Sequence, residues 1–197
     1  MGGRAVDAMA HHYRQRPRGG KRGRIDNRQL RHRSCPMADR YLLIVWHGRT
    51  GSCESLAEAA FEGAGNHARL MRARDVQPRH LLDASGYLFI CPENLASMSG
   101  EMKEMFDRCY YPVLMKISGR PFATIIAAGS DGEWAQKQID RIAKGWRLKR
   151  VAEQMIVDTG AQTEAEITAP KTISASRLGD ARELGAALGQ GIAEGIL

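Results

Sequence analysis

The sequence contains no long apolar stretch, because its longest apolar runs hold six to eight residues, as at 41–46 and 123–128. A membrane-spanning helix needs roughly 18 to 20 consecutive apolar residues. No segment near residue 1 has the apolar core of about 7 to 15 residues that a secretory signal requires. The sequence therefore predicts neither a membrane span nor a secretory signal, and we expect a cytoplasmic location.

Recognisable metal and nucleotide motifs are also missing. The four cysteines form no Cys-x-x-Cys pair and have no His at a ligand spacing, so we expect no metal site and no disulfide framework. Gly-Lys-Ser and Gly-Lys-Thr do not occur, which argues against a Walker-type nucleotide triphosphatase. The glycine pattern at 63–68 resembles a dinucleotide loop, but it follows a predicted helix and precedes a strand, the reverse of the required order.

Acidic residues are scarce only at the start of the chain. Residues 1–36 hold ten Lys and Arg against two Asp, whereas residues 37–197 hold 19 basic and 20 acidic residues. A basic segment attached to a neutral domain is most simply a solvated tail, whereas nucleic-acid binding is indicated by a basic stripe on the folded surface. We therefore do not expect nucleic acid as a partner. We expect residues 1–37 to be a basic disordered tail and residues 38–197 one domain. Contact with an anionic surface, a targeting role and a translation start at Met37 stay open.

From residue 40, short apolar runs alternate with amphipathic stretches. Continuous apolar runs are typical of strands buried on both faces of a parallel sheet, and apolar residues three and four apart are typical of helices. Strands are predicted at 41–46, 68–73, 87–91, 121–128 and 152–157, and helices at 53–64, 78–82, 99–110, 135–146 and 178–192. This alternation predicts a doubly wound α/β domain with a five-stranded parallel sheet of order 2-1-3-4-5.

Ligands of such sheets bind beyond the carboxyl ends of the strands, at the switch point between strands one and three. Glycines after the first strand allow the backbone N–H groups to turn inward, the following helix start adds partial positive charge, and Thr50 and Ser52 add hydroxyl donors. We expect a terminal phosphate to bind here, at His47, Gly48, Arg49, Thr50, Gly51, Ser52 and Cys53. The alternative is that Thr50 or Ser52 only caps the helix.

Three segments at the ends of the first, third and fourth strands resemble the flavodoxin-like, FMN-binding NAD(P)H-dependent oxidoreductases. Residues 49–52 are similar to the phosphate loop of that family, residues 92–108 to its flavin-ring loop and following helix, and residues 119–132 to its fourth strand and second ring loop. The resemblance covers about residues 40–158. It implies a flavodoxin-like, three-layer α/β/α fold with FMN as cofactor.

The resemblance also implies which residues hold the flavin ring. Relatives often have an aromatic residue where Asn94 stands and a Gly where Ala96 stands, which leaves Trp134 as the nearest aromatic candidate. Met98, Met102 and Met105 have the spacing of core residues, and Met98 is placed where it also reaches the ring. The ring-binding residues implied are Pro92, Glu93, Asn94, Leu95, Ala96, Ser97, Met98, Gly129, Ser130, Asp131, Gly132 and Trp134.

The activity implied by the resemblance is hydride transfer from NAD(P)H, through bound FMN, to a quinone, a flavin or a similar small-molecule acceptor. The cofactor performs this chemistry, so no side-chain acid, base or nucleophile is expected. A one-electron flavodoxin carrier is the alternative, but its basic partners would favour a strongly acidic face, and residues 37–197 have a net charge of −1. A fold that has lost its flavin and acts as an interaction module also stays open. Relatives are often dimers, so a homodimer is a further expectation.

Overall fold

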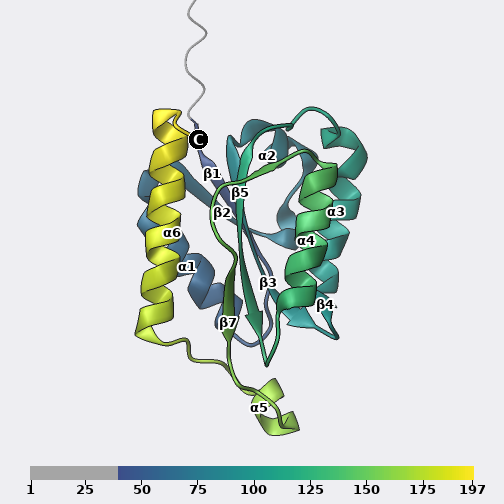
Figure 1. Ribbon diagram of the computed structural model, residues 1–197, viewed down its shortest axis with the longest axis vertical. Helices are drawn as coiled ribbons and strands as arrows, with labels where there is room; N and C mark the ends of the chain where they lie inside the picture. The colour runs from purple at the N-terminus through teal and green to yellow at the C-terminus, as the bar shows by residue number, and fades with distance from the viewer. Residues whose placement is uncertain (1–39) are drawn as a thin grey trace, which may run out of the picture. The chain divides into compact units, whose positions relative to one another are not determined.

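The computed structural model describes residues 40–197 (Figure 1). The predicted tail at residues 1–37 lies outside this range. The strands are β1 (Leu42–Trp46), β2 (Ala68–Arg72), β3 (Gly86–Asn94), β4 (Ser97–Met98), β5 (Pro121–Ala128), β6 (Lys149–Arg150) and β7 (Met155–Asp158). The α-helices are α1 (Ser52–Ala64), α2 (Pro78–Asp83), α3 (Gly100–Val113), α4 (Glu133–Gly145), α5 (Glu164–Thr168) and α6 (Ala175–Glu194), and two 3₁₀ turns lie at Gly65–His67 and Ala73–Asp75.

The strands form one sheet of order β2-β1-β3-β5-β6, in which β7 also pairs with β5 and β4 pairs with β3. All of these pairs are parallel except the antiparallel pair of β3 with β4. Since β5 is the fourth long strand, and β6 and β7 together take the place of the fifth, the predicted order 2-1-3-4-5 is confirmed. The fold is a flavodoxin-like α/β sheet with helices on both faces.

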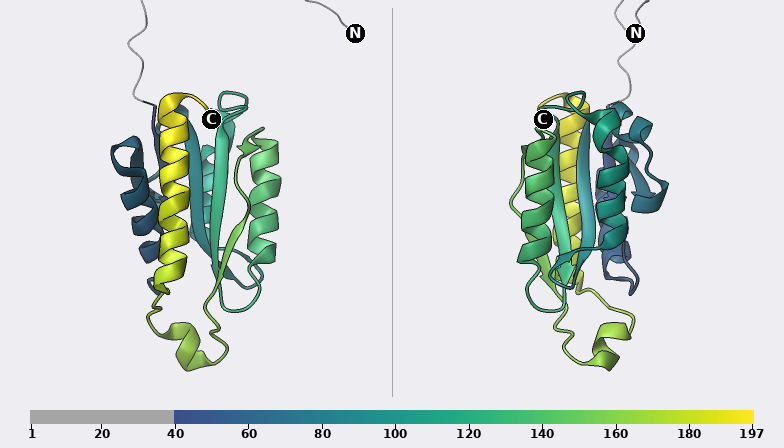
Figure 2. Two further views of the ribbon diagram at one scale, coloured as in Figure 1. Left: turned by 60° about the vertical axis from the view of Figure 1, so that its left-hand side comes forward. Right: turned by 90° about the vertical axis from the view of Figure 1, so that its right-hand side faces the viewer.

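The two faces of the sheet carry separate apolar cores, because successive side chains of a strand point to opposite faces. Leu42, Ile44 and Trp46 pack toward α1 and α6, whereas Leu43 and Val45 pack toward α2, α3 and α4. Figure 2 shows α6, in yellow, and α4, in green, on opposite sides of the sheet. The sheet is therefore the middle of three layers, and β1 is buried on both of its faces.

Helices α1 and α6 approach each other closely because glycine stands at their contact. A Cβ atom at Gly185 would lie 1.9 Å from the carbonyl oxygen of Ala60, and one at Gly63 would lie 1.9 Å from that of Arg182. Neither distance is compatible with a side chain, so any larger residue would push the helices apart. The glycine pattern at 63–68 is the end of α1, as expected, with Gly65 at its C-cap.

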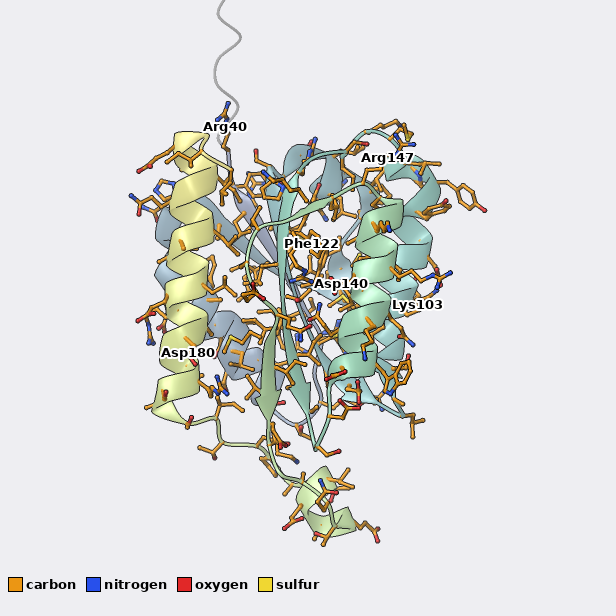
Figure 3. All side chains as sticks on the ribbon, viewed as in Figure 1. Arg40, Lys103, Phe122, Asp140, Arg147 and Asp180 are labelled. Atoms are coloured by element: carbon orange, nitrogen blue, oxygen red, sulfur yellow. The ribbon has the colours of Figure 1, made fainter. Side chains whose placement is uncertain are left out.

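The fifth strand differs from the prediction. Residues 151–154 lie outside the ladder, so that β6 at 149–150 and β7 at 155–158 stand in place of the predicted continuous strand at 152–157. The Arg150 guanidinium donates to the Thr124 hydroxyl at 3.2 Å and to the Ala152 carbonyl at 3.3 Å, and it pairs with Asp140. Asp140 lies on α4 on the side toward β5, which carries Phe122 (Figure 3). These side-chain bonds stabilise the interruption between β6 and β7. Apolar periodicity could not predict it, because the bonds are polar.

Two further elements were not predicted. Strand β3 runs through Asn94 and turns back into β4, and the short helix α5 lies in the connection between β7 and α6. None of the helices within residues 40–197 is both long and apolar enough to span a bilayer. The same residues contain no group of His, Cys, Asp and Glu side chains that could hold a metal ion.

Candidate functional site

The segments that follow β1, β3 and β5 meet at one edge of the sheet. Trp46 at the end of β1 is in register with Ile90 of β3, and Pro92 of β3 is in register with Ala127 of β5. Because parallel strands end at the same edge, residues 47–52, 92–98 and 129–132 lie there together, at the end of the sheet where α5 stands in Figure 1. The structure thus brings together the three predicted segments.

The predicted phosphate loop leads into an open helix start. Gly51 has φ +91° and is the N-cap of α1, where it makes no side-chain cap. The Ser52 hydroxyl contacts the Cys53 sulfur at 4.0 Å. The alternative in which Thr50 or Ser52 caps α1 is therefore wrong, because Gly51 is the N-cap and neither hydroxyl accepts from the first N–H groups of α1. The first N–H groups of an uncapped helix carry partial positive charge, which suits an anion.

The side chains of this loop divide into buried and exposed. Cys53 is fully buried against β1 and α6, and burial raises the pKa of its thiol to about 12. Ser52 is also buried, at 6% exposure, whereas Thr50 is half-buried and Arg49 is exposed. The prediction that Cys53 contributes to the site is wrong for its side chain, because that side chain fills the core. Thr50 and Arg49 are the side chains free to meet a phosphate.

His47 lies on the opposite face of the sheet edge from α1. Its side chain is buried, its Nε2 is 3.7 Å from the carboxylate of Glu101, and its Nδ1 has no partner within residues 40–197. Burial lowers the pKa of His47, Arg49 acts in the same direction, and Glu101 opposes both. The imidazole is therefore neutral at pH 7, with one ring nitrogen available to a ligand or a water molecule.

Ser99, the N-cap of α3, is the second residue at this edge with a buried polar atom that has no partner within residues 40–197. Its hydroxyl makes no cap to α3 and has no hydrogen-bond partner in the described part of the chain, although the Cys91 thiol lies beside it. Cys91 is completely buried, and burial raises the pKa of its thiol, so it is a small core residue as expected. Two orphaned polar atoms, on His47 and Ser99, thus stand near the switch point, as expected where a polar ligand completes a site.

The predicted ring loop at 92–98 is a β-hairpin. Glu93 pairs with Met98 and Asn94 with Ser97, which leaves Leu95 and Ala96 as the two turn residues. Their φ angles of 52° and 53° match the tight turn that usually requires Asn or Gly. Leu95 is fully exposed, while Met98 is 2% exposed and packs in the core beneath α3 and α4. The prediction that the Met98 side chain reaches the ring is therefore wrong, because pairing with Glu93 turns it inward.

Two side chains hold this hairpin on α4. The Glu93 carboxylate accepts from the N–H groups of Gly132 at 3.2 Å and Ala135 at 2.9 Å. Gln138 accepts from the Ser97 hydroxyl at 2.9 Å and from the Met98 N–H at 3.1 Å. Glu93 therefore spans the two predicted ring segments. Gln138 was missed by the sequence analysis, because a polar residue on a helix surface carries no signal of its distant partner.

The second ring segment carries the one aromatic residue predicted near the ring. Gly129, Ser130 and Asp131 follow β5, and Asp131 accepts from the Glu133 N–H at 3.1 Å. Trp134 lies in the first turn of α4 with 55% of its surface exposed, and the Lys137 ammonium stands 5.1 Å from its ring centre. Trp134 is thus exposed beside the second ring segment, and its contact with a flavin stays a prediction.

The connection from β7 to α6, residues 159–174, joins two of the three site segments. Thr159 donates its N–H to the Ala128 carbonyl at 2.8 Å, and the Gln162 amide donates to the Gly129 carbonyl at 2.9 Å. A Cβ at Gly129 would lie 2.7 Å from the Ala161 carbonyl oxygen, so this approach requires glycine. At its other end the connection meets the phosphate loop, where Lys171 donates its N–H to the Thr50 carbonyl.

Helix α5 within this connection was missed by the sequence analysis. Its capping box was the available signal: Thr163 accepts from the Glu166 N–H, and the Glu166 side chain accepts from the Thr163 N–H. The helix has five residues, too few for apolar periodicity to register.

Residues 78–162, which include both ring segments, match the protein family described as NADPH-dependent FMN reductase. The match begins after the phosphate loop. No curated protein matches the chain significantly.

Solved structures with similar folds include a WrbA-like flavodoxin from Agrobacterium tumefaciens, with 20% identity and a TM-score of 0.62 over 79% of this chain and 98% of that one. A flavodoxin from the domain Archaea has 14% identity and a TM-score of 0.62 over 77% and 98%. The flavodiiron protein from Giardia intestinalis has 17% identity and a TM-score of 0.63 over 79% of this chain, which spans 37% of that longer protein. Together the comparisons show a flavodoxin-like fold in which residues 78–162 are similar to the NADPH-dependent FMN reductase family.

Proposed function

We propose that this protein is an FMN-dependent oxidoreductase that uses NAD(P)H to reduce a quinone, a flavin or a similar small-molecule acceptor. The observation that carries the proposal is the family match over both ring segments, on a sheet whose edge also brings in the phosphate loop. When bound, FMN supplies the two-electron chemistry that links NAD(P)H to the acceptor. The protein supplies binding, orientation and electrostatics.

The phosphate of FMN would be held mainly by backbone. The uncapped start of α1 offers N–H groups, Thr50 adds a hydroxyl, and the exposed Arg49 adds positive charge. Charge-assisted hydrogen bonds of this kind contribute about 1.5 to 3 kcal/mol each. The orphaned Nδ1 of His47 and the hydroxyl of Ser99 would bind polar groups of the cofactor chain, directly or through water.

The flavin ring would be held between the 92–98 hairpin and residues 129–134. Leu95 and Trp134 are the large exposed apolar side chains on these two segments. Asn94 and Ala96 leave the hairpin without an aromatic residue, which supports an open ring face on which a nicotinamide could stack at about 3 to 3.5 Å. Such a face favours an enzyme over a carrier.

A one-electron carrier is the second candidate, because flavodoxins share this fold. The carrier has less support than the enzyme, because a carrier that docks basic redox proteins needs an acidic face. The net charge of residues 37–197 is only −1. Cytoplasmic location and a homodimer remain parts of the proposal, and sedimentation of the purified protein tests the second.

The deciding experiment is anaerobic titration of FMN-loaded protein with NADPH and with NADH. The proposal expects rapid two-electron bleaching of the flavin by at least one nucleotide, followed by reoxidation on addition of a quinone or free flavin. A flavin that stays oxidised with both nucleotides, yet takes single electrons from a reductase, would favour the carrier. Failure to bind FMN at all would leave only an interaction module.

A further inference from the structure

Glu93 connects the two segments to which the proposed function assigns the flavin ring. It lies in the hairpin strand β3, and its two carboxylate oxygens accept separately from Gly132 N–H at 3.2 Å and Ala135 N–H at 2.9 Å. These donors are 39 and 42 residues further along the chain. One side chain therefore sets the spacing between the two segments.

The same carboxylate caps the start of α4 from a distant strand, beside Asp131, which accepts from the Glu133 N–H. The N-cap of α4 is Gly132, which has no side chain to accept from the first N–H groups of the helix. Free N–H groups at a helix start need acceptors and attract negative charge. Glu93 and Asp131 together supply both, so carboxylates offset the partial positive charge at the start of α4.

We propose that Glu93 is a positioning residue that fixes the gap between the ring segments and also lowers the reduction potential of the bound flavin. The inference rests on the proposed function. Taking up two electrons and one proton adds a negative charge to the ring, and a carboxylate fixed between the two segments that hold the ring disfavours that charge. The consequence is a stronger reductant, suited to passing both electrons to an acceptor.

Three variants separate the charge of Glu93 from its reach. Glu93→Gln keeps the side-chain length and removes the charge, whereas Glu93→Asp keeps the charge and shortens the reach. Glu62→Gln is the control, because Glu62 lies in the last turn of α1, outside the three site segments, and its carboxylate pairs with Arg182 at 2.8 Å. The measurements are the FMN dissociation constant and the two-electron midpoint potential of each FMN-loaded protein.

We expect Glu93→Gln to bind reduced flavin about tenfold more tightly relative to oxidised flavin, which for two electrons raises the midpoint potential by about 30 mV. Glu93→Asp should weaken FMN binding several-fold while its potential stays near that of the wild type. The control should change neither quantity. An unchanged potential in Glu93→Gln, or an equal shift in Glu62→Gln, would overturn the inference.

A measurement on the apoprotein tests the positioning role of Glu93 separately from the proposed function. In the apoprotein, Glu93→Ala should speed amide hydrogen exchange at Gly132 and Ala135 at least tenfold compared with Glu62→Gln. Unchanged exchange would overturn the positioning role even if FMN binds. A wild-type protein that binds no FMN would overturn the proposed function and the redox part, while the exchange result would still decide whether Glu93 holds the two segments together.

Discussion

The backbone N–H of Lys171 donates to the carbonyl oxygen of Thr50 at 2.7 Å, which ties the last connection of the chain to the predicted phosphate loop. The Lys171 ammonium donates at 2.5 to 3.1 Å to three carbonyls around the end of α5, those of Glu166, Ile167 and Ala169. One residue therefore stabilises both α5 and the phosphate loop. The relationship links segments that are far apart in the sequence.

Lys171→Met should weaken FMN binding by roughly fivefold, because hydrogen bonds worth about 1 kcal/mol net are lost and the hold on Thr50 loosens. Titration of the apoprotein with FMN, followed by flavin fluorescence, measures the effect. Lys116→Met, at an exposed lysine outside the site segments, serves as the control and should bind FMN normally. Equal affinities in both variants would show that residues 159–174 do not support the phosphate loop.

Thr50→Asp should lower FMN affinity by more than tenfold, because it places a negative charge beside the phosphate at the cost of a favourable hydrogen bond of about 1.5 to 3 kcal/mol. Thr50 is half-buried, so the folded domain should tolerate the change, unlike Asp at the buried Ser52. Thr50→Ser keeps the hydroxyl and should bind as the wild type does. Normal FMN affinity in Thr50→Asp would move the phosphate site away from this loop.

Stability should fall as the pH is lowered through 6.5, the ordinary pKa of histidine. Burial lowers the pKa of His47 in the folded protein, so the unfolded chain binds more protons in this range and the free energy of unfolding decreases with falling pH. The loss ends below the folded-state pKa. Urea denaturation at several pH values between 5 and 7.5 measures it.

His47→Gln should reduce this pH dependence, because the variant has no imidazole to protonate. Burial also lowers the pKa of His80, so His80→Gln is the necessary comparison and accounts for the second histidine. If the free energy of unfolding of His47→Gln changed with pH as that of the wild type does, His47 would have the same pKa in the folded and unfolded states.

Arg150→Met should destabilise the domain by about 1 to 2 kcal/mol, since Thr124 and Asp140, which Gln136 also joins, lose a shared partner that is partly buried. FMN binding should not change, because these residues lie away from the three site segments. Arg177→Met removes the exposed pair with Asp180 and should change the free energy of unfolding by less than about 1 kcal/mol. Urea denaturation of both variants checks the ranking, and equal effects would contradict the role given to this network.

Much of the fold could be predicted from the sequence. Apolar runs and helical spacing predicted the order of the long strands, and Trp46, Met102 and Met105 are core residues as expected. The segment 47–52 was predicted correctly as a glycine-bearing turn into a helix, because the glycine conformation and the helix start are local properties, whereas its binding of a phosphate stays a prediction. Such features depend on neighbouring residues, and the sequence alone contains those neighbours.

Only the tertiary structure decided the details of the candidate site. Leu95 and Ala96 form a turn that their own preferences disfavour, because pairing of Glu93 with Met98 and the bonds to α4 outweigh the local cost. The same pairing directs Met98 into the core, and the Lys171 contact brings residues 159–174 to Thr50. Each of these outcomes depends on partners tens of residues away, whose positions are set by chain topology and packing, so no local pattern could have predicted them.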